Sequence, residues 1–145
     1  MKVFTIGFTG KTAERFFTIL QRSGAQRIVD VRLNNVSQLS GFAKSKDLAY
    51  FARAICGMDY VHLRELAPEQ AMLDEYKKKG GDWAAYEQHF LALMERRAVE
   101  KSVRPELIDQ GCLLCSEHKP DQCHRRLVVE YLGRKWSGMA VEHLV

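Results

Sequence analysis

The 145-residue sequence contains no run of about 18 consecutive apolar residues, the minimum length expected of a membrane-spanning helix. Its first residues, MKVFTIGFTGKT, lack the long apolar core and the small-residue cleavage site of a secretory signal peptide. The sequence also lacks internal repeats, low-complexity tracts and linker-like stretches. These absences predict a single cytoplasmic domain over residues 1–145 that has no membrane partner.

The sequence also has little excess charge, with 22 lysines and arginines against 18 acidic residues and a net charge of +4. This small positive excess slightly favours anionic binding partners, although an ordinary solvated surface would account for it equally well. The chain is long enough to bury a core of its own, so folding requires neither a metal nor a disulfide. In the cytoplasm the four cysteines should be reduced thiols.

Short apolar or alternating segments alternate with segments of helical periodicity along the chain. The expected strands cover residues 2–8, 27–31, 59–63, 111–115 and 139–145, and the main helices cover 13–23, 47–56, 83–99 and 122–135. Such alternation is typical of βαβ units. It predicts a three-layer αβα sandwich with a mainly parallel sheet of about five strands and a helical insert after the third strand.

The expected strand ends indicate where a ligand would bind, because open parallel sheets bind ligands beyond their carboxyl ends. TIGFTGKT resembles a phosphate-binding P-loop, but Thr5 stands where that motif requires glycine, which excludes nucleoside triphosphatase activity. A weaker expectation is that the loop approaches a phosphate or carboxylate. The candidate substrate-binding residues at the first two strand ends are Gly7, Gly10, Lys11, Asp30 and Arg32.

Asp30 and Arg32 are two residues apart in IVDVR, so they should share one face of a buried strand. A buried aspartate needs a cationic partner or several N–H donors to remain ionised. We expect Arg32 to supply that charge, and an arginine held in place by Asp30 would be preorganised for an anionic ligand.

The stretch CLLCSEHKPDQCHRR, residues 112–126, holds three of the four cysteines. Cys112 and Cys115 have the spacing of half a zinc site or of a redox pair. If 111–115 is a strand, however, residues three apart point to opposite faces of the sheet. Cys112 is then a core thiol, and zinc would bind only if this segment were a loop. We therefore expect no bound metal and no cofactor.

Pro120-Asp121 predicts the start of a helix capped near Asp121 or Gln122, with CHRR in its first turn. Free N–H groups and the positive dipole end at such a turn favour anions and lower the pKa of a cysteine. Arg125 and Arg126 would add donors to an oxyanion. Alternatively, Cys123 and His124 pack in the core and the arginines are solvated or paired with nearby acids.

The motifs TIGF, IVDVR, GFAK, DYVHLRELAP, DWAAYEQHF and above all LLCSEHKPDQCHRR resemble the bacterial and archaeal family called domain of unknown function 488. The resemblance runs nearly end to end and supports the fold and the position of the site, but it implies no reaction. The chain departs from the commoner form at 34–36, where Asn-Asn-Val replaces a proline-containing turn. The family pattern falls on Gly7, Asp30, Arg32, Cys115, Glu117, Pro120, Cys123, His124 and Arg125.

The first functional hypothesis is an enzyme whose crevice holds an anionic substrate, such as a nucleotide or a nucleic acid. Arginines would bind the anion, a cysteine would be the nucleophile, and an acid or imidazole would carry the proton. The alternative is a non-catalytic module that binds nucleic acid or an acidic partner, and a structural zinc protein is third. The candidate catalytic residues are Cys115, Glu117, Cys123 and His124, and the candidate anion-binding side chains are Arg32, Arg125 and Arg126.

Overall fold

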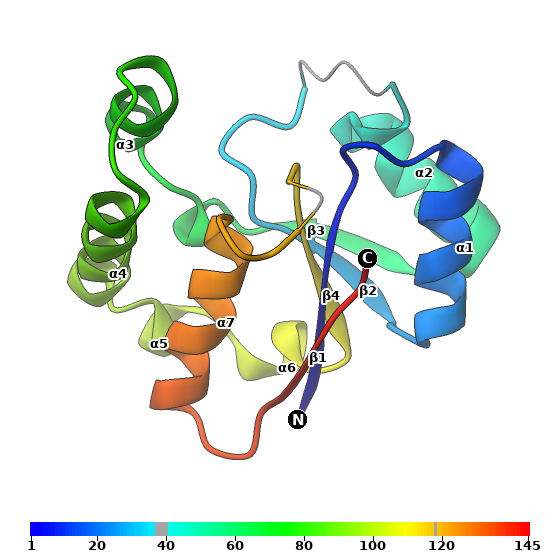
Figure 1. Cartoon of the computed structure of the whole chain (residues 1–145). Helices are drawn as coiled ribbons and strands as arrows, with labels where there is room; N and C mark the ends of the chain where they lie inside the picture. The colour runs from blue at the N-terminus through cyan, green and yellow to red at the C-terminus, as the bar shows by residue number, and fades with distance from the viewer. Residues whose placement is uncertain (37–40, 118) are drawn as a thin grey trace.

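The computed structural model of the chain describes residues 1–36, 41–117 and 119–145, and Figure 1 shows its elements. The strands are β1 (Lys2–Gly7), β2 (Arg27–Asp30), β3 (Asp59–His62), β4 (Gly111–Cys115) and β5 (Ala140–His143). The longer helices are α1 (Ala13–Ser23), α2 (Ser45–Cys56), α4 (Trp83–Arg97) and α7 (His124–Lys135). The short helical elements are η1 (Gly41–Ala43), η2 (Arg64–Leu66), α3 (Gln70–Leu73), η3 (Asp74–Lys78), α5 (Val99–Ser102) and α6 (Pro105–Ile108).

The strands form one five-stranded sheet in the order β3-β2-β4-β1-β5, and every pair is parallel. Strand β4 lies at the centre, where Gly7 at the end of β1 pairs with Cys115 and Asp30 at the end of β2 pairs with Leu114. The predicted parallel α/β sandwich, with its helical insert between β3 and β4, is therefore confirmed.

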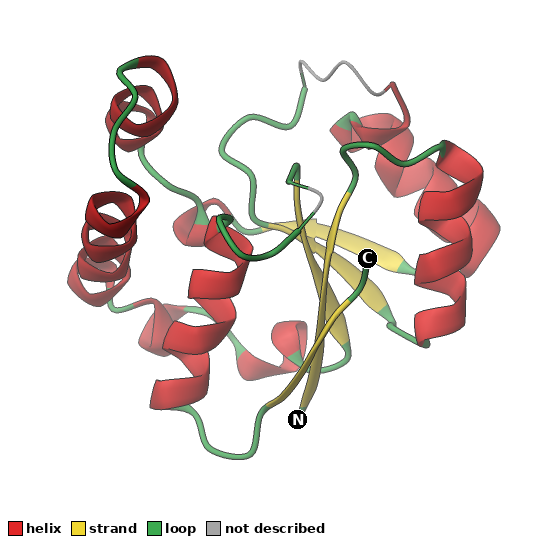
Figure 2. Ribbon diagram, in the orientation of Figure 1, coloured by secondary structure: helices red, strands yellow, loops and turns green. Residues whose placement is uncertain are grey.

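Helices cover both faces of the sheet (Figures 1 and 2), and alternate residues of β1, β2 and β4 enter two separate cores. Phe4, Ile28 and Cys112 pack on the side of α1 and α2. Val29 and Cys115 face the opposite side, where α4 and α7 supply the covering side chains. This period of two is the one expected of strands buried on both faces.

The ends of α1 agree with the sequence prediction. The Thr12 side chain accepts a hydrogen bond from the Arg15 N–H at 3.1 Å, and Gly24 ends the helix in the left-handed conformation with φ 80°. In α2, Leu48 and Ala52 are buried whereas Ile55 is 46% exposed, so this helix turns only part of its apolar surface toward the sheet. Among the described residues, no helix has the length and apolar character needed to cross a bilayer.

The predicted start of the last helix was wrong by two residues. A turn precedes the helix, in which the Cys123 N–H donates to the Pro120 carbonyl at 3.2 Å. This turn keeps residue 123 extended, with φ −139° and ψ 139°, so that α7 begins at His124. Neither Asp121 nor Gln122 caps the helix: Cys123 occupies the cap position without a side-chain capping bond.

Candidate functional site

A crevice lies at the carboxyl ends of β2 and β4 and encloses about 600 Å³ of space, open solvent included. These strands are neighbours, but the chain leaves β2 toward α2 on one face and leaves β4 toward α7 on the other. Connections that diverge in this way leave an opening between them, as in other open parallel sheets. Among the side chains that line it are Arg32, Tyr86, Cys115, Glu117, Cys123 and His124.

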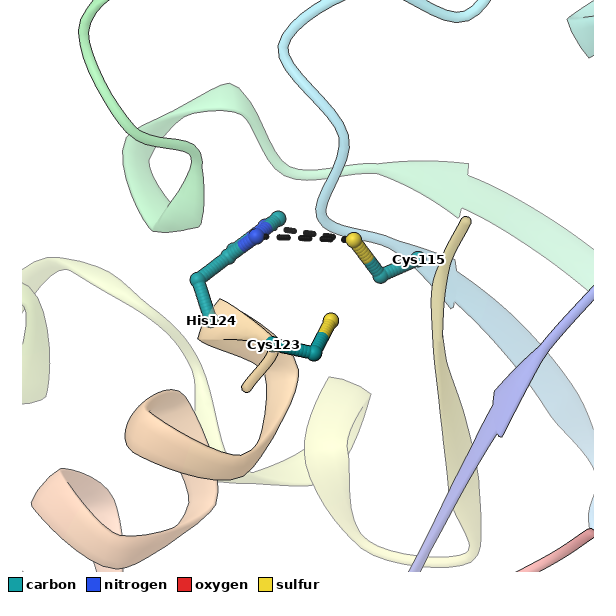
Figure 3. A group of neighbouring side chains, drawn as sticks. All are labelled: Cys115, Cys123 and His124. Atoms are coloured by element: carbon teal, nitrogen blue, oxygen red, sulfur yellow. Dashed lines mark hydrogen bonds between the residues drawn. The ribbon is translucent and has the colours of Figure 1, made fainter. Parts of the chain in front are cut away.

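The centre of the crevice is a thiol–imidazole pair, shown in Figure 3. The Sγ atom of Cys115, at the end of β4, lies 3.4 Å from Nδ1 of His124, the first residue of α7. The other ring nitrogen, Nε2, lies 2.7 Å from the carbonyl oxygen of Val31. Because a carbonyl only accepts, Nε2 carries a proton, and Nδ1 is the atom that exchanges one with the thiol.

The surroundings of this pair favour a thiolate on Cys115. A hydrogen bond from Cys123 is the largest influence that lowers the pKa of the Cys115 thiol, and the charge of His124 and a backbone N–H of Ser116 outweigh burial with it. Burial raises the pKa of Cys123, and the neighbouring Cys115 raises it further. Burial alone would lower the pKa of His124, but Cys115 and the Val31 carbonyl raise it. Of the two thiols, Cys115 is therefore the one whose surroundings favour the thiolate.

Cys112 takes no part in this cluster. It is fully buried in the core on the α1 and α2 side, where burial raises the pKa of its thiol. Donor atoms of Cys115, Cys123 and His124 lie within 4.8 Å of one another, so these three side chains could hold a metal ion. A structural zinc site uses four protein donors. The zinc site considered from the sequence, in which Cys112 and Cys115 would both bind the ion, does not form because Cys112 is on the far side of the sheet.

Arg32 enters the crevice from the end of β2 and is held by Asp30 through a bidentate ion pair. Arg32 Nε donates to Oδ1 of Asp30 at 2.9 Å and Nη2 donates to Oδ2 at 2.8 Å. The Asp30 carboxylate, which is fully buried, also accepts from the Tyr60 hydroxyl and from the Asn35 side chain. This network fixes the arginine as the sequence predicted.

The remaining terminal nitrogen of Arg32 is a donor without an acceptor. Arg32 is only 4% exposed, and its Nη1 atom is buried with no hydrogen-bond partner among the described residues. An unsatisfied buried donor costs about 1–3 kcal/mol, and more when the group is charged. Since Arg32 lines the crevice, an acceptor on a bound ligand would satisfy it.

Glu117 lies at the rim of the crevice rather than beside the thiol. Its side chain is 47% exposed and pairs with Lys77 Nζ at 3.2 Å. The main-chain carbonyl of Glu117 accepts a hydrogen bond from Arg125, which holds the loop after β4. Of the two proton carriers proposed from the sequence, His124 is thus the one in contact with Cys115.

Six of the seven residues expected to bind substrate do not line the crevice. Lys11 donates to the Gly7 carbonyl at 2.8 Å, and Arg125 is fully buried and donates to the Thr5 hydroxyl at 3.3 Å. Both contacts are therefore made to β1 rather than to the space of the crevice. The residues outside the crevice are Gly7, Gly10, Lys11, Asp30, Arg125 and Arg126.

Gly10 and Arg126 lie at the surface for separate reasons. Gly10 is exposed and has φ 78°, which a tight turn requires and glycine adopts without strain. Arg126 pairs with Glu130 at 2.9 Å and with Glu87 at 3.4 Å. It therefore belongs to a network along α7 and α4, which agrees with the structural alternative weighed for this arginine.

Tyr86 lies on the buried face of α4 and also lines the crevice, a position that was not predicted from the sequence. It is 5% exposed, and its hydroxyl makes no hydrogen bond within the part of the chain that the structure describes. Burial, with the nearby Cys115 and Cys123, raises the pKa of this phenol, so the hydroxyl remains a donor. The signal was a phenol on an otherwise apolar stripe, which usually has a polar partner.

The fold and this site define a parallel α/β protein that carries a buried thiol–imidazole pair beside a fixed arginine at the carboxyl edge of its sheet. The family model described as domain of unknown function DUF488 matches residues 12–132, and the chain belongs to that family. The resemblance noted in the motifs is thereby confirmed. The comparison with curated proteins found no match, and neither did the comparison with solved structures.

Proposed function

We propose that this protein is an enzyme that uses Cys115 as a nucleophile on an anionic substrate bound by Arg32. The observation that carries the proposal is the 3.4 Å contact between Cys115 Sγ and His124 Nδ1 in a crevice that Arg32 also lines, its buried Nη1 having no partner among the described residues. A nucleophile in contact with an oriented base, beside a donor for substrate charge, is the arrangement that covalent catalysis requires.

The reaction class that fits is transfer of an acyl or phosphoryl group. The Cys115 thiolate forms a bond to the electrophilic atom, the bond from that atom to the leaving group breaks, and the proton on His124 Nδ1 passes to the leaving group. The imidazole, now neutral at Nδ1, then takes a proton from water as the water oxygen bonds to the same atom. The bond to sulfur breaks, which restores the thiolate and releases the product.

The alternative of a purely binding module is supported less well. Surface charge recognition would use exposed cations, whereas Arg32 is buried and lines a crevice that also contains a thiol and an imidazole. Burial of an ionised thiol–imidazole pair carries a desolvation cost. Groups with perturbed pKa values are concentrated at catalytic sites, which favours a catalytic role for the pair. Binding of nucleic acid would be an additional property, tested by its dependence on salt.

Alkylation of Cys115 by iodoacetamide is expected to persist at low pH. Because the folded environment lowers the pKa of this thiol, the thiolate stays populated as the pH falls. We expect the rate constant to fall less than about fivefold from pH 8 to pH 6.5, whereas a free thiol of pKa ~8.5 loses roughly twentyfold. Rates are measured by peptide mapping after chelator treatment, in a Cys56→Ser background that removes the partly exposed thiol.

The matched control for this profile is His124→Gln, which retains a donor for the Val31 carbonyl but carries no positive charge. Its profile should move toward higher pH. If Cys115 of the parent reacts about tenfold faster with each pH unit up to pH 8, as an ordinary thiol does, the proposed nucleophile is wrong. Preferential labelling of Cys123 at pH 6.5 would likewise contradict the assignment.

Iodoacetate is expected to react with Cys115 faster than iodoacetamide does, once each rate is divided by its rate with glutathione. The carboxylate of the anionic reagent satisfies Arg32 Nη1, and a hydrogen bond to a charged group contributes about 1.5–3 kcal/mol, or roughly tenfold or more. In Arg32→Lys the ammonium still pairs with Asp30 but no second terminal nitrogen remains. This variant should lose most of the preference, and an unchanged ratio would exclude Arg32 as the anion donor.

A further inference from the structure

Three aromatic side chains form one wall of the crevice, and we call Tyr76, Trp83 and Tyr86 the aromatic wall. Their rings contact one another, with centroid separations of 5.5 Å for Tyr76 and Trp83, 5.2 Å for Tyr76 and Tyr86, and 5.1 Å for Trp83 and Tyr86. All three line the same cavity as Cys115 and Arg32. The wall comes from the helical insert, since Tyr76 lies in η3 and the other two lie in α4.

A chain of ring contacts connects the aromatic wall to His124. Tyr86 stacks on Phe90 at 6.2 Å, and Phe90 lies 5.5 Å from the His124 ring. At the other end the wall is tied to the loop after β4, because the Tyr76 hydroxyl donates to Gln122 at 3.3 Å and Lys77 pairs with Glu117 at 3.2 Å. The wall is therefore held in place beside the thiol.

Packing within the protein covers only part of the surface of the aromatic wall. Tyr86 is buried, but Tyr76 and Trp83 are half-buried and border the open space of the crevice. The hydroxyl of Tyr86 also has no partner in the described part of the chain. Apolar rings combined with a few unsatisfied polar groups are typical of a ligand pocket, and an aromatic surface accepts flat rings by stacking.

The geometry points to a substrate that joins an oxyanion to a flat aromatic ring, as a phosphorylated aryl compound or a nucleoside monophosphate does. The ring lies on the aromatic wall, the oxyanion meets Arg32 Nη1, and the attacked atom lies at Cys115 Sγ. This inference rests on the proposed function for the anion contact. It adds the wall as the determinant of specificity, with Tyr86 as a neutral donor toward the substrate.

The test compares the binding of phenylphosphonate and methylphosphonate, whose carbon–phosphorus bonds give the thiolate no leaving group. Trp83 is one of two tryptophans, so Trp136→Phe leaves its fluorescence as the signal. Stacking contributes about 1–3 kcal/mol per ring, so phenylphosphonate should bind about 5- to 150-fold more tightly and quench Trp83. Trp83→Leu, measured by calorimetry, should lose most of this ratio.

Tyr50→Ala is the matched control, because Tyr50 is an exposed aromatic residue on α2 away from the crevice. It should leave the ratio unchanged. Equal binding of the two phosphonates would overturn the aromatic subsite and leave the anion site standing. Binding of neither would overturn both the subsite and the anion contact of Arg32, while the alkylation profile of Cys115 would still report on the nucleophile.

Discussion

Replacing Gly7 by alanine is expected to destabilise the protein by about 3 kcal/mol or more, near the upper end for overpacking. A Cβ atom at this position would lie 1.5 Å from the carbonyl oxygen of Glu117 and 2.9 Å from Nη1 of Arg125. Neither neighbour can move freely. The Glu117 oxygen belongs to the backbone, and the Arg125 guanidinium is buried and hydrogen-bonded to that oxygen. The loop after β4 must leave its place, so the Cys115–His124 contact should be disturbed as well.

The free energy of unfolding is measured by urea denaturation, and the site is followed through the alkylation rate of Cys115. Gly133→Ala is the control because Gly133 lies within α7, where a Cβ atom would meet only the Met139 sulfur at 3.8 Å. That substitution should be neutral or stabilise by up to about 1 kcal/mol, since alanine favours helices. A Gly7→Ala protein as stable and as reactive as the parent would show that the loop contact is unimportant.

Asp30→Asn is expected to destabilise the protein by about 3–5 kcal/mol, the range for breaking a buried ion pair. The substitution leaves the Arg32 charge buried without compensation, and the new amide places N–H donors toward a guanidinium that only donates. It also removes the bidentate bonds that orient Arg32. The preference for iodoacetate at Cys115 should therefore weaken under conditions in which the variant is still folded.

The control for this prediction is the surface pair of Glu142 and Lys2, whose charged atoms are 3.0 Å apart. Exposed ion pairs contribute about 0–1 kcal/mol, so Glu142→Gln should change the unfolding free energy by no more than that. Urea denaturation of both variants gives the comparison. If Asp30→Asn costs no more than Glu142→Gln, the interpretation of Asp30 as the anchor of Arg32 is wrong.

Much of the fold was predictable because the local signals agree with one another. Residues 13–23 have helical periodicity between Thr12 and Gly24, and both ends are as predicted. The GCLLC strand was also correct to the residue. Strand order could not be predicted, because β-branched and apolar residues show that a strand is buried without showing which strands are its neighbours.

The parallel sheet predicted that the candidate residues lie along one edge, since carboxyl ends share one edge, but not which of them meet. Two features were beyond sequence reasoning. The first is the turn at Pro120–Cys123, which shifts the start of α7 to His124 and is closed by a backbone hydrogen bond from Cys123 to Pro120. Gly7, Lys11 and Arg125 were expected in the crevice but lie outside it. Lys11 donates to the Gly7 carbonyl and Arg125 donates to the Glu117 carbonyl, which lies against Gly7 because β1 is beside β4. The catalytic and binding roles themselves stay predictions.

The two parts of the crevice have different origins in the chain. The thiol, the imidazole and the guanidinium are anchored at the ends of β4 and β2 and the start of α7, whereas the aromatic wall belongs to the insert between β3 and β4. Under the proposed function, substitutions at the half-buried Tyr76 and Trp83 would change which molecules bind while leaving the thiol and the imidazole in place. A lineage with the proposed activity would then diversify its substrates while it conserves a single chemistry.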